Sequence, residues 1–129
     1  MNGRAVLIRG PSGSGKSDLA LRLLDRGFAL VSDDQTIVSR DGNRLIASAP
    51  PTIAGKLEVR GVGIVEMEHE DEVPIAIVVE LTSDIQRIPD DSREQFILGI
   101  ALPLVSIDAL TASAPSKVAL ALDRIGLRS

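Results

Sequence analysis

The chain has 129 residues, a length typical of one domain, and 44% of them are hydrophobic, which is enough for a core. Only 2% are aromatic, so the core must be built from aliphatic side chains. The net charge of −4 argues against a nucleic-acid partner, and the absence of cysteine excludes disulfides and thiolate chemistry. The longest apolar run, residues 97–105, is far shorter than the roughly 20 residues that span a bilayer, and the N-terminus lacks a signal-peptide pattern. We therefore expect a single cytoplasmic domain over residues 1–129, without a membrane or nucleic-acid partner.

The chain opens with a predicted strand, loop and helix. Residues 4–9 have an apolar centre typical of a short buried strand, and they run directly into a glycine-rich segment at residues 10–17. Apolar side chains then recur at helical spacing over residues 18–26, and Gly27 follows as a residue typical of a helix C-terminus. This order of elements is the context in which a glycine-rich loop binds phosphate.

The next segments indicate a second strand and a hairpin. Residues 28–32 have the composition of a strand, which ends at the acidic residues 33–34. Residues 35–40 and 43–47 flank Asp41-Gly42, a pair typical of tight hairpin turns. The first half of the chain therefore combines strands with one helix.

The second half of the chain predicts further strands and one helix. The glycine-punctuated stretch 57–65 indicates a loop that enters a strand. The remaining elements are an acidic solvated turn, a strand, a second turn, two more strands and a helix, in chain order residues 66–72, 74–81, 88–91, 95–100, 103–107 and 116–124. Ser113 lies near the cap of this helix and Pro115 in its first turn. We predict an α/β fold with a mixed, strand-rich sheet and two main helices.

Residues 10–17 match the phosphate-binding pattern G-x-x-x-x-G-K-[ST] in full; they are Gly10, Pro11, Ser12, Gly13, Ser14, Gly15, Lys16 and Ser17. The glycines let backbone N–H groups turn toward an anion, and the helix that follows points its N-terminus at the same anion. Lys16 supplies a positive charge for the β- and γ-phosphates, and the Ser17 hydroxyl can bind Mg²⁺. An ordinary glycine-rich turn needs neither the strand before it nor the helix after it. The pattern therefore predicts ATP and Mg²⁺ as ligands.

Two carboxylates follow the helix where a phosphate site needs them. If strand 28–32 lies parallel to strand 4–9, Asp33 and Asp34 reach the sheet edge that holds the phosphates. Neighbouring side chains of an extended chain point in opposite directions, so one carboxylate can face the phosphate and the other the metal or a structural partner. The alternative is that the two residues simply open a turn.

Two other residues that could do chemistry carry weaker signals. Glu58 lies in the glycine-rich stretch, where one acid and one base could close a metal or substrate site, although a surface hairpin explains the pattern as well. His69 is the only histidine and lies among acidic residues, so we expect it to be solvated and assign it no catalytic role.

The chain resembles the catalytic domain of HPr kinase/phosphorylase, through three features in the family's order: the phosphate loop, Leu30-Val31-Ser32-Asp33-Asp34, and Leu57-Glu58-Val59-Arg60-Gly61-Val62-Gly63-Ile64. The likeness covers most of the chain and is densest over residues 4–64. It implies a P-loop kinase-like fold of the PEP carboxykinase-like type, and a kinase that phosphorylates a seryl hydroxyl of HPr. HPr is the carrier protein of the sugar phosphotransferase system or of its nitrogen-related branch. The resemblance also implies a phosphate-using reverse reaction and a homohexamer.

The resemblance assigns a role to each residue that matches by position. Lys16 would bind and neutralise the transferred phosphoryl group, and Ser17 and Glu58 would hold Mg²⁺. Asp34 would be the general base toward serine in the forward reaction and a proton donor in the reverse, with Asp33 as a supporting member of the site. The segment that would lie across the substrate runs to residue 66 and begins with Leu57, Glu58, Val59, Arg60, Gly61, Val62 and Gly63.

The chain departs from the family pattern in three ways. It resembles the short form without an N-terminal domain. It begins at Met1, just inside the first strand, so the histidine that the family carries before that strand has no counterpart, and either the start is truncated or the site works without it. The stretch 108–117 before the last helix contains no arginine, and Lys117 is its only cation, which favours the kinase direction over the phosphorylase direction.

Two other functions remain compatible with the phosphate loop. A small-molecule kinase usually has a basic lid, for which residues 82–93 offer Arg87 and Arg93 in a short and partly acidic stretch. A nucleotide-binding sensor without chemistry is suggested by the missing histidine. The serine kinase is the interpretation that we favour, because it alone accounts for all three segments.

Overall fold

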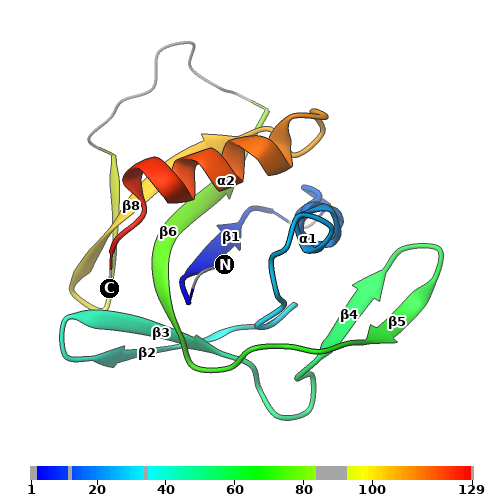
Figure 1. The fold of residues 1–129 in the computed structure, drawn as a ribbon, viewed down its shortest axis with the longest axis horizontal. Coiled ribbons are helices and arrows are strands. Elements are labelled where there is room, and N and C mark those ends of the chain that lie inside the picture. Colours follow the sequence, from blue (N-terminus) through cyan, green and yellow to red (C-terminus); the bar gives the residue numbers. More distant parts are fainter. Residues whose placement is uncertain (1–2, 12, 34, 84–92, 129) are drawn as a thin grey trace.

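The computed structural model describes residues 3–11, 13–33, 35–83 and 93–128, which form eight strands and two helices (Figure 1). The strands, in chain order, are β1 (Ala5–Arg9), β2 (Ile37–Asp41), β3 (Arg44–Ser48), β4 (Lys56–Val59), β5 (Gly63–Glu66), β6 (Val73–Leu81), β7 (Glu94–Ile97) and β8 (Ile100–Ile107). The helices are α1 (Lys16–Leu24) and α2 (Ala114–Ile125). No helix in this part of the chain combines the length and the apolar character that crossing a membrane requires.

Six of the strands form one mixed sheet. Its order is β2-β3-β6-β8-β7, and β1 pairs with β6. The strands β1, β6 and β8 are parallel, so their carboxyl ends meet at one edge. Figure 1 shows that β6 is long and bent: Val73 and Pro74 pair with β3, and the strand pairs with β1 from Ile75 onward. The predicted α/β fold with a mixed sheet and two helices is confirmed.

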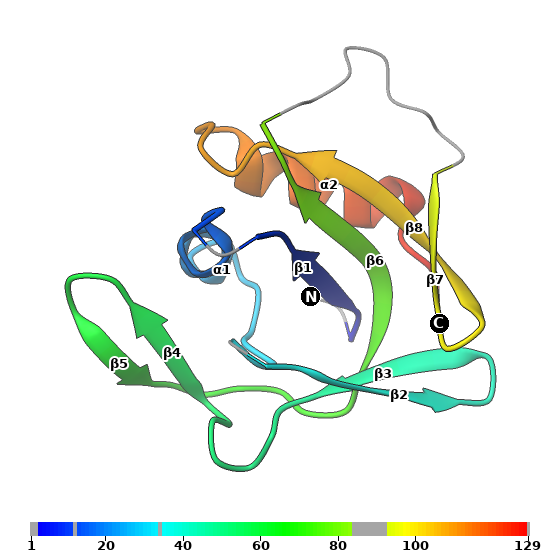
Figure 2. The ribbon, with the colours of Figure 1, turned by 180° about the vertical axis from the view of Figure 1, so that it is seen from behind.

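The two faces of the sheet carry separate parts of the core. On one face α1 and α2 pack against the parallel strands, and Figures 1 and 2 show α2 crossing β6 and β8. The buried side chains on this face are Leu19, Leu23, Val79, Leu81, Ile107, Ala109, Ala114 and Val118. On the other face the β2–β3 hairpin curves toward the β7–β8 turn, where Arg40 Nη1 donates to the Leu98 carbonyl at 3.0 Å. The core here consists of Ala5, Leu45, Ala47, Val73, Ile75, Val78, Leu102 and Leu104.

The first strand, both helices and the hairpin are confirmed, with shifts of a few residues. The two-residue turn of the β2–β3 hairpin is Gly42-Asn43 rather than Asp41-Gly42, because Asp41 pairs with Arg44. Likewise β7 and β8 meet at Leu98-Gly99, and β8 begins three residues before Pro103. The turn predicted at residues 88–91 lies outside the described residues. His69 is exposed in its acidic stretch, as predicted.

The prediction of a strand at residues 28–32 is wrong. Only Leu30 makes a bridge, an isolated one to His69. The segment is apolar because it packs against both cores: Phe28 is partly buried against the helix-side core and Val31 against the opposite core. A cavity of about 180 Å³ is lined by this segment and by β1, so the two run alongside each other without forming a ladder.

The stretch predicted as a loop entering a strand is a complete hairpin. Strands β4 and β5 pair only with each other and form a separate two-stranded sheet. Figure 1 shows this hairpin projecting from the body of the molecule beside α1. Gly61 and Gly63, with φ of +85° and +116°, allow the turn between its strands.

Candidate active site

The glycine-rich loop joins β1 to α1 at the carboxyl edge of the parallel strands. Gly13 and Gly15 have φ of +80° and +94°, a left-handed region that favours glycine. Gly10 has a different reason to lack a side chain. A Cβ there would lie 2.7 Å from Ser14 Oγ and 3.2 Å from Leu81 Cβ. The path of the loop therefore depends on glycine at three positions.

Two side chains of this loop are placed to meet an anion. Lys16 reaches back across the loop, and its Nζ donates to the carbonyls of Gly10 at 2.6 Å and Pro11 at 3.4 Å. Ser14 Oγ is buried and has no hydrogen-bond partner among the described residues. The first N–H groups of α1 also have no partner within the helix. Unpaired donors beside an ammonium group fit the phosphates of ATP. The predicted nucleotide-binding residue Ser12 lies outside the described residues.

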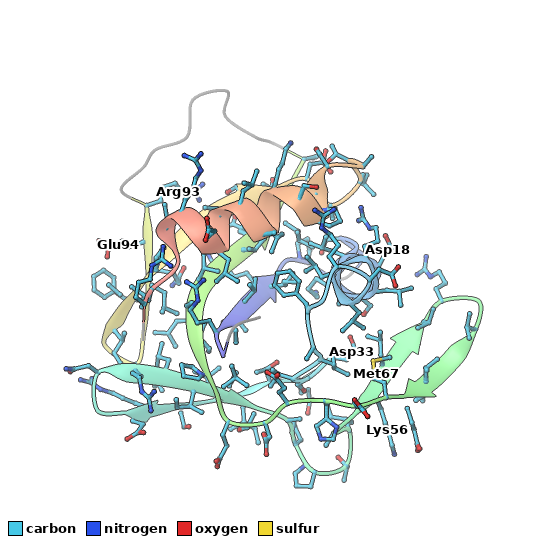
Figure 3. All side chains as sticks on the ribbon, viewed as in Figure 1. Asp18, Asp33, Lys56, Met67, Arg93 and Glu94 are labelled. Atoms are coloured by element: carbon cyan, nitrogen blue, oxygen red, sulfur yellow. The ribbon has the colours of Figure 1, made fainter. Side chains whose placement is uncertain are left out.

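Asp33 joins the start of α1 to the β4–β5 hairpin. The Ser17 hydroxyl donates to Asp33 Oδ1 at 2.9 Å, and the backbone N–H of Glu58 donates to Asp33 Oδ2 at 3.0 Å. Figure 3 shows Asp33 between the helix and the hairpin. The structure thus brings together three predicted site residues from three separate segments. Asp34, the predicted general base, lies outside the described residues.

The oxygen atoms at this point fit Mg²⁺. A serine hydroxyl and a carboxylate are hard ligands, and Mg²⁺ is commonly held by one or two protein groups together with phosphates and water. The side chain of Glu58 is exposed, and its backbone N–H is the group that contacts Asp33. Within the described ranges, no three His, Cys, Asp or Glu side chains are grouped closely enough to bind a metal. The residues therefore suit an Mg²⁺ ion whose coordination is completed by the phosphates of ATP.

The hairpin presents the predicted substrate segment at the surface. Leu57 is fully buried, and β4 packs against α1. At the other end of the hairpin, Val62 and Ile64 are 74% and 71% exposed, which is unusual for large apolar side chains. Arg60, Gly61 and Gly63 are exposed as well. One end of the segment is thus anchored, and the other is available for contact.

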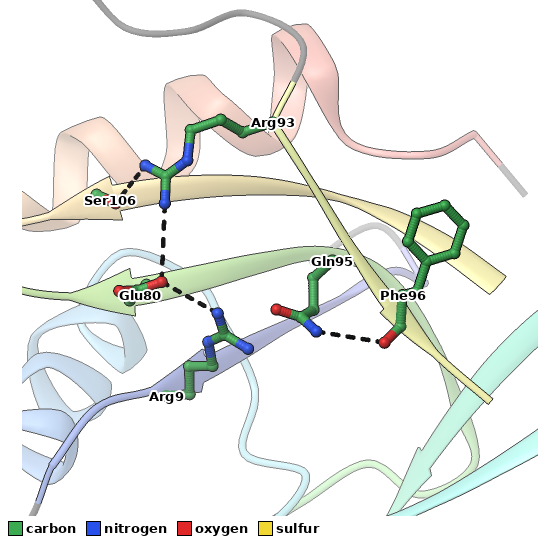
Figure 4. A network of polar contacts seen from close by, with 6 residues as sticks. All are labelled: Arg9, Glu80, Arg93, Gln95, Phe96 and Ser106. Carbon is green, nitrogen blue, oxygen red and sulfur yellow. Dashed lines mark hydrogen bonds and ion pairs between the residues drawn. The ribbon is translucent and has the colours of Figure 1, made fainter. Parts of the chain in front are cut away.

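A polar network that the sequence did not indicate lies at the carboxyl ends of the strands. Arg9, Glu80 and Ser106 are neighbours in register on β1, β6 and β8. Arg9 donates to the Glu80 carboxylate at 3.0 Å, and Arg93 donates to Ser106 Oγ at 2.7 Å while lying 3.8 Å from Glu80 (Figure 4). Strand alternation places Glu80 on the face opposite the helices. The network therefore holds Arg9, the residue directly before Gly10 of the phosphate loop.

The same network bears on the basic lid considered for a small-molecule kinase. Arg93 is turned toward β8, where it contacts Ser106, and Arg87 lies outside the described residues. The signal that could have revealed the network is the register of β1, β6 and β8, which sequence alone does not give.

Comparison with known proteins identifies the family. Residues 1–121 match the family model of the HPr serine kinase C-terminal domain. The chain belongs to this family. Among curated relatives, HPr kinase/phosphorylase from Prosthecochloris aestuarii is 36% identical over 118 residues, which are 81% of this chain and 35% of the relative. The enzyme from Limosilactobacillus reuteri is 34% identical over 124 residues, with 86% and 39% covered.

A solved structure supports the same assignment. The HPr(Ser) kinase/phosphatase from Coxiella burnetii superposes on 92% of this chain and 80% of its own with a TM-score of 0.80 and 27% identity. The resemblance to HPr kinase/phosphorylase and the predicted fold are therefore confirmed. The chain spans about a third of the length of the curated relatives that it matches.

Proposed function

We propose that this member of the HPr serine kinase family is an ATP-dependent protein serine kinase. Its acceptor is HPr or the nitrogen-branch carrier that resembles HPr, and its compartment is the cytoplasm. The observation that carries the proposal is the Asp33 carboxylate, which is held between the Ser17 hydroxyl of the phosphate loop and the backbone of the substrate hairpin. The relatives' names, HPr kinase/phosphorylase, support the reaction and the acceptor.

The forward reaction needs one bond to form and one to break. The seryl oxygen attacks the γ-phosphorus, the bond from that phosphorus to the bridging oxygen breaks, and ADP leaves. Lys16 stabilises the negative charge of the transferred group, and Asp34 takes the seryl proton. Ser17 and Glu58 would hold Mg²⁺, which would neutralise phosphate charge, and Asp33 orients Ser17. In the reverse direction an oxygen of inorganic phosphate attacks the phosphorus of phosphoserine, the bond from that phosphorus to the seryl oxygen breaks, Asp34 returns the proton to the seryl oxygen, and pyrophosphate leaves.

The acceptor surface that we propose is the hairpin segment from Leu57 to Glu66. Its exposed residues Val62 and Ile64 offer apolar contacts, and Arg60 offers a positive charge. The chain also exposes apolar side chains away from the hairpin, such as Phe96 at 66%, which suits the homohexamer implied by the resemblance.

The test combines labelled ATP, Mg²⁺ and purified HPr with the wild-type chain and two variants. The wild type should transfer label to a serine of HPr. Lys16→Ala should lose transfer because the phosphoryl charge is no longer neutralised. Asp34→Asn should bind ATP almost normally and slow transfer by about 10²–10⁴-fold, the range of a general base.

Three results would contradict the proposal. An Asp34→Asn variant that phosphorylates HPr at the wild-type rate would remove the assigned base. Label transfer to nucleosides or sugar acids but not to HPr would indicate a small-molecule kinase. Tight ATP binding by the wild type without transfer to any acceptor would indicate a nucleotide sensor.

A further inference from the structure

The loop between β8 and α2, residues 108–113, lies beside the phosphate loop. A Cβ placed on Gly15 would lie 3.3 Å from the Cβ of Ala109. Ala109 is buried in the same cluster as Leu19 of α1. Figures 1 and 2 both place this loop on the side of α1 opposite the β4–β5 hairpin. The phosphate loop therefore has Asp33 and the hairpin on one side and residues 108–113 on the other.

Arg22 holds this loop against α1. Its guanidinium donates to the carbonyl of Thr111 at 3.1 Å and to the carbonyl of Ala109, and its Nε lies 3.2 Å from the Asp18 carboxylate. The loop is also braced from within, because Asp108 Oδ1 accepts the N–H of Leu110 at 2.9 Å. The backbone of residues 108–111 is thus fixed relative to the helix that follows the phosphate loop.

Leu110 is the side chain that this fixed loop presents to its surroundings. It is 87% exposed, the largest exposed fraction among the described large apolar residues that face solvent. An apolar side chain held at a defined place beside a phosphate site is well suited to pack on a flat apolar ligand surface, since ligand sites combine a few polar groups with apolar walls.

The ends of ATP can be assigned to the two sides of the phosphate loop. The reacting phosphoryl group must lie toward Asp33 and the hairpin, where the acceptor arrives. The nucleoside must then leave the loop elsewhere, and among the described residues those at 108–113 border the loop on the side away from Asp33 and the hairpin. We propose that this loop is the wall on which the nucleoside of ATP lies, with Leu110 as the contact and Arg22 as the positioning residue. The inference rests on the proposed use of ATP, but not on the identity of the acceptor.

Binding of two Mg²⁺-loaded probes, ATP and inorganic tripolyphosphate, tests the proposal. Tripolyphosphate has the phosphates but no nucleoside. Leu110→Asp and Arg22→Ala should each weaken ATP binding by about tenfold, the effect of losing one apolar contact or its support. Both variants should bind tripolyphosphate within about twofold of the wild type. In the kinase assay the KM for ATP should rise while kcat at saturating ATP stays nearly constant.

Matched variants separate positioning from general damage. Leu120→Asp places the same charge at another exposed leucine, on α2, and should leave ATP binding unchanged. Asp18→Asn removes the ion pair of Arg22 but keeps both hydrogen bonds to the loop carbonyls, so it should also bind ATP normally. Arg22→Lys should recover part of the lost affinity, because an ammonium can still donate to a carbonyl.

The outcomes that overturn the inference are distinct. Normal ATP binding by Leu110→Asp would exclude the contact, and this exposed substitution decides the matter even if Arg22→Ala does not fold. Equal losses for ATP and tripolyphosphate would mean that the variants damage the phosphate loop itself. A raised KM for HPr with unchanged ATP binding would assign the loop to the protein partner. If the wild type binds neither probe, both proposals fail; if ATP binding follows the pattern but HPr is not phosphorylated, only the proposed function fails.

Discussion

Gly10 shows how single atoms shape the phosphate loop. It lies close to Ser14 of the same loop and to Leu81 at the end of β6, so a Cβ at this position would contact both residues. The loop glycines Gly13 and Gly15 instead rely on positive φ. Steric and conformational requirements thus act at different glycines of one motif.

At this scale we predict that Gly10→Ala weakens ATP binding. The new methyl group would lie 2.7 Å from Ser14 Oγ and 3.2 Å from Leu81 Cβ, and Leu81 cannot yield without moving β6. Titration with Mg²⁺-ATP measures the loss. Gly42→Ala is the control: its φ is +61° and open space surrounds it, so it should cost about 1–2 kcal/mol of stability and leave ATP binding intact. Wild-type affinity in Gly10→Ala would show that the loop can relax.

Individual site residues were predictable to different degrees. Lys16 and Ser17 follow from the motif, because its spacing defines their roles. Asp33 reaches the site although the strand expected to carry it is absent, since the hydrogen bonds to Ser17 and to the hairpin hold it instead. Arg22 was not predictable as a clamp, because its acceptors are carbonyls almost 90 residues away: 87 for Ala109 and 89 for Thr111.

Among the elements, the β4–β5 hairpin depends most on its attachments. A two-stranded sheet alone is marginally stable in water. This hairpin is held by the buried Leu57 against α1 and by the hydrogen bond from the Glu58 N–H to Asp33. Its arrangement, anchored at the base and exposed at the tip, separates stability from partner contact within one element.

We predict that Leu57→Ala mainly lowers stability, whereas Val62→Ser mainly lowers phosphoryl transfer to HPr. Leu57→Ala should lower the free energy of unfolding by about 2–5 kcal/mol because it leaves a cavity beside α1. Val62→Ser, at a position 74% exposed, should change that free energy by less than about 0.5 kcal/mol yet weaken transfer to HPr. Urea denaturation and the labelled-ATP assay measure the two effects. Normal transfer by Val62→Ser would remove this tip residue from the acceptor surface.

Element types were predictable where one physical cause dominates the pattern. Helices α1 and α2 follow from apolar spacing, and the β2–β3 hairpin follows from its turn residues. The prediction for residues 28–32 is wrong because packing against a core is enough to make a segment apolar: Phe28 and Val31 are partly buried against the two cores but belong to no strand. The register of β1, β6 and β8, and with it the Glu80 network, arises from long-range pairing that local patterns do not encode.

Across the whole molecule, Arg4 links the two ends of the chain. Its side chain is buried and donates to the carbonyls of Leu122 at 3.2 Å and Leu127 at 3.5 Å, at the C-terminus of α2. Helix ends leave carbonyls without partners inside the helix, and a cation is favourable there. The backbone N–H of Leu127 also donates to the Ala76 carbonyl of β6 at 2.9 Å. The last helix is thus fastened to the central strands.

We predict that Arg4→Met lowers the free energy of unfolding by about 1–3 kcal/mol, because buried carbonyls lose their donor while the aliphatic volume is largely kept. Urea denaturation measures it. Arg128→Met is the control, because this exposed arginine donates to the Asp123 carbonyl at the surface, and it should have little effect. Equal effects of the two variants would mean that Arg4 does not fasten the helix.

The double attachment of Asp33 has an evolutionary consequence. One carboxylate accepts a hydrogen bond from Ser17 on one oxygen and from the Glu58 N–H on the other. Asparagine offers one acceptor and one donor, so it can keep the bond from the Glu58 N–H only if the Ser17 hydroxyl accepts from its NH₂ instead of donating, and glutamate is longer by one methylene group. Substitutions at position 33 therefore act on the phosphate loop and on the hairpin through the same side chain, so the two parts of the site share one evolutionary constraint.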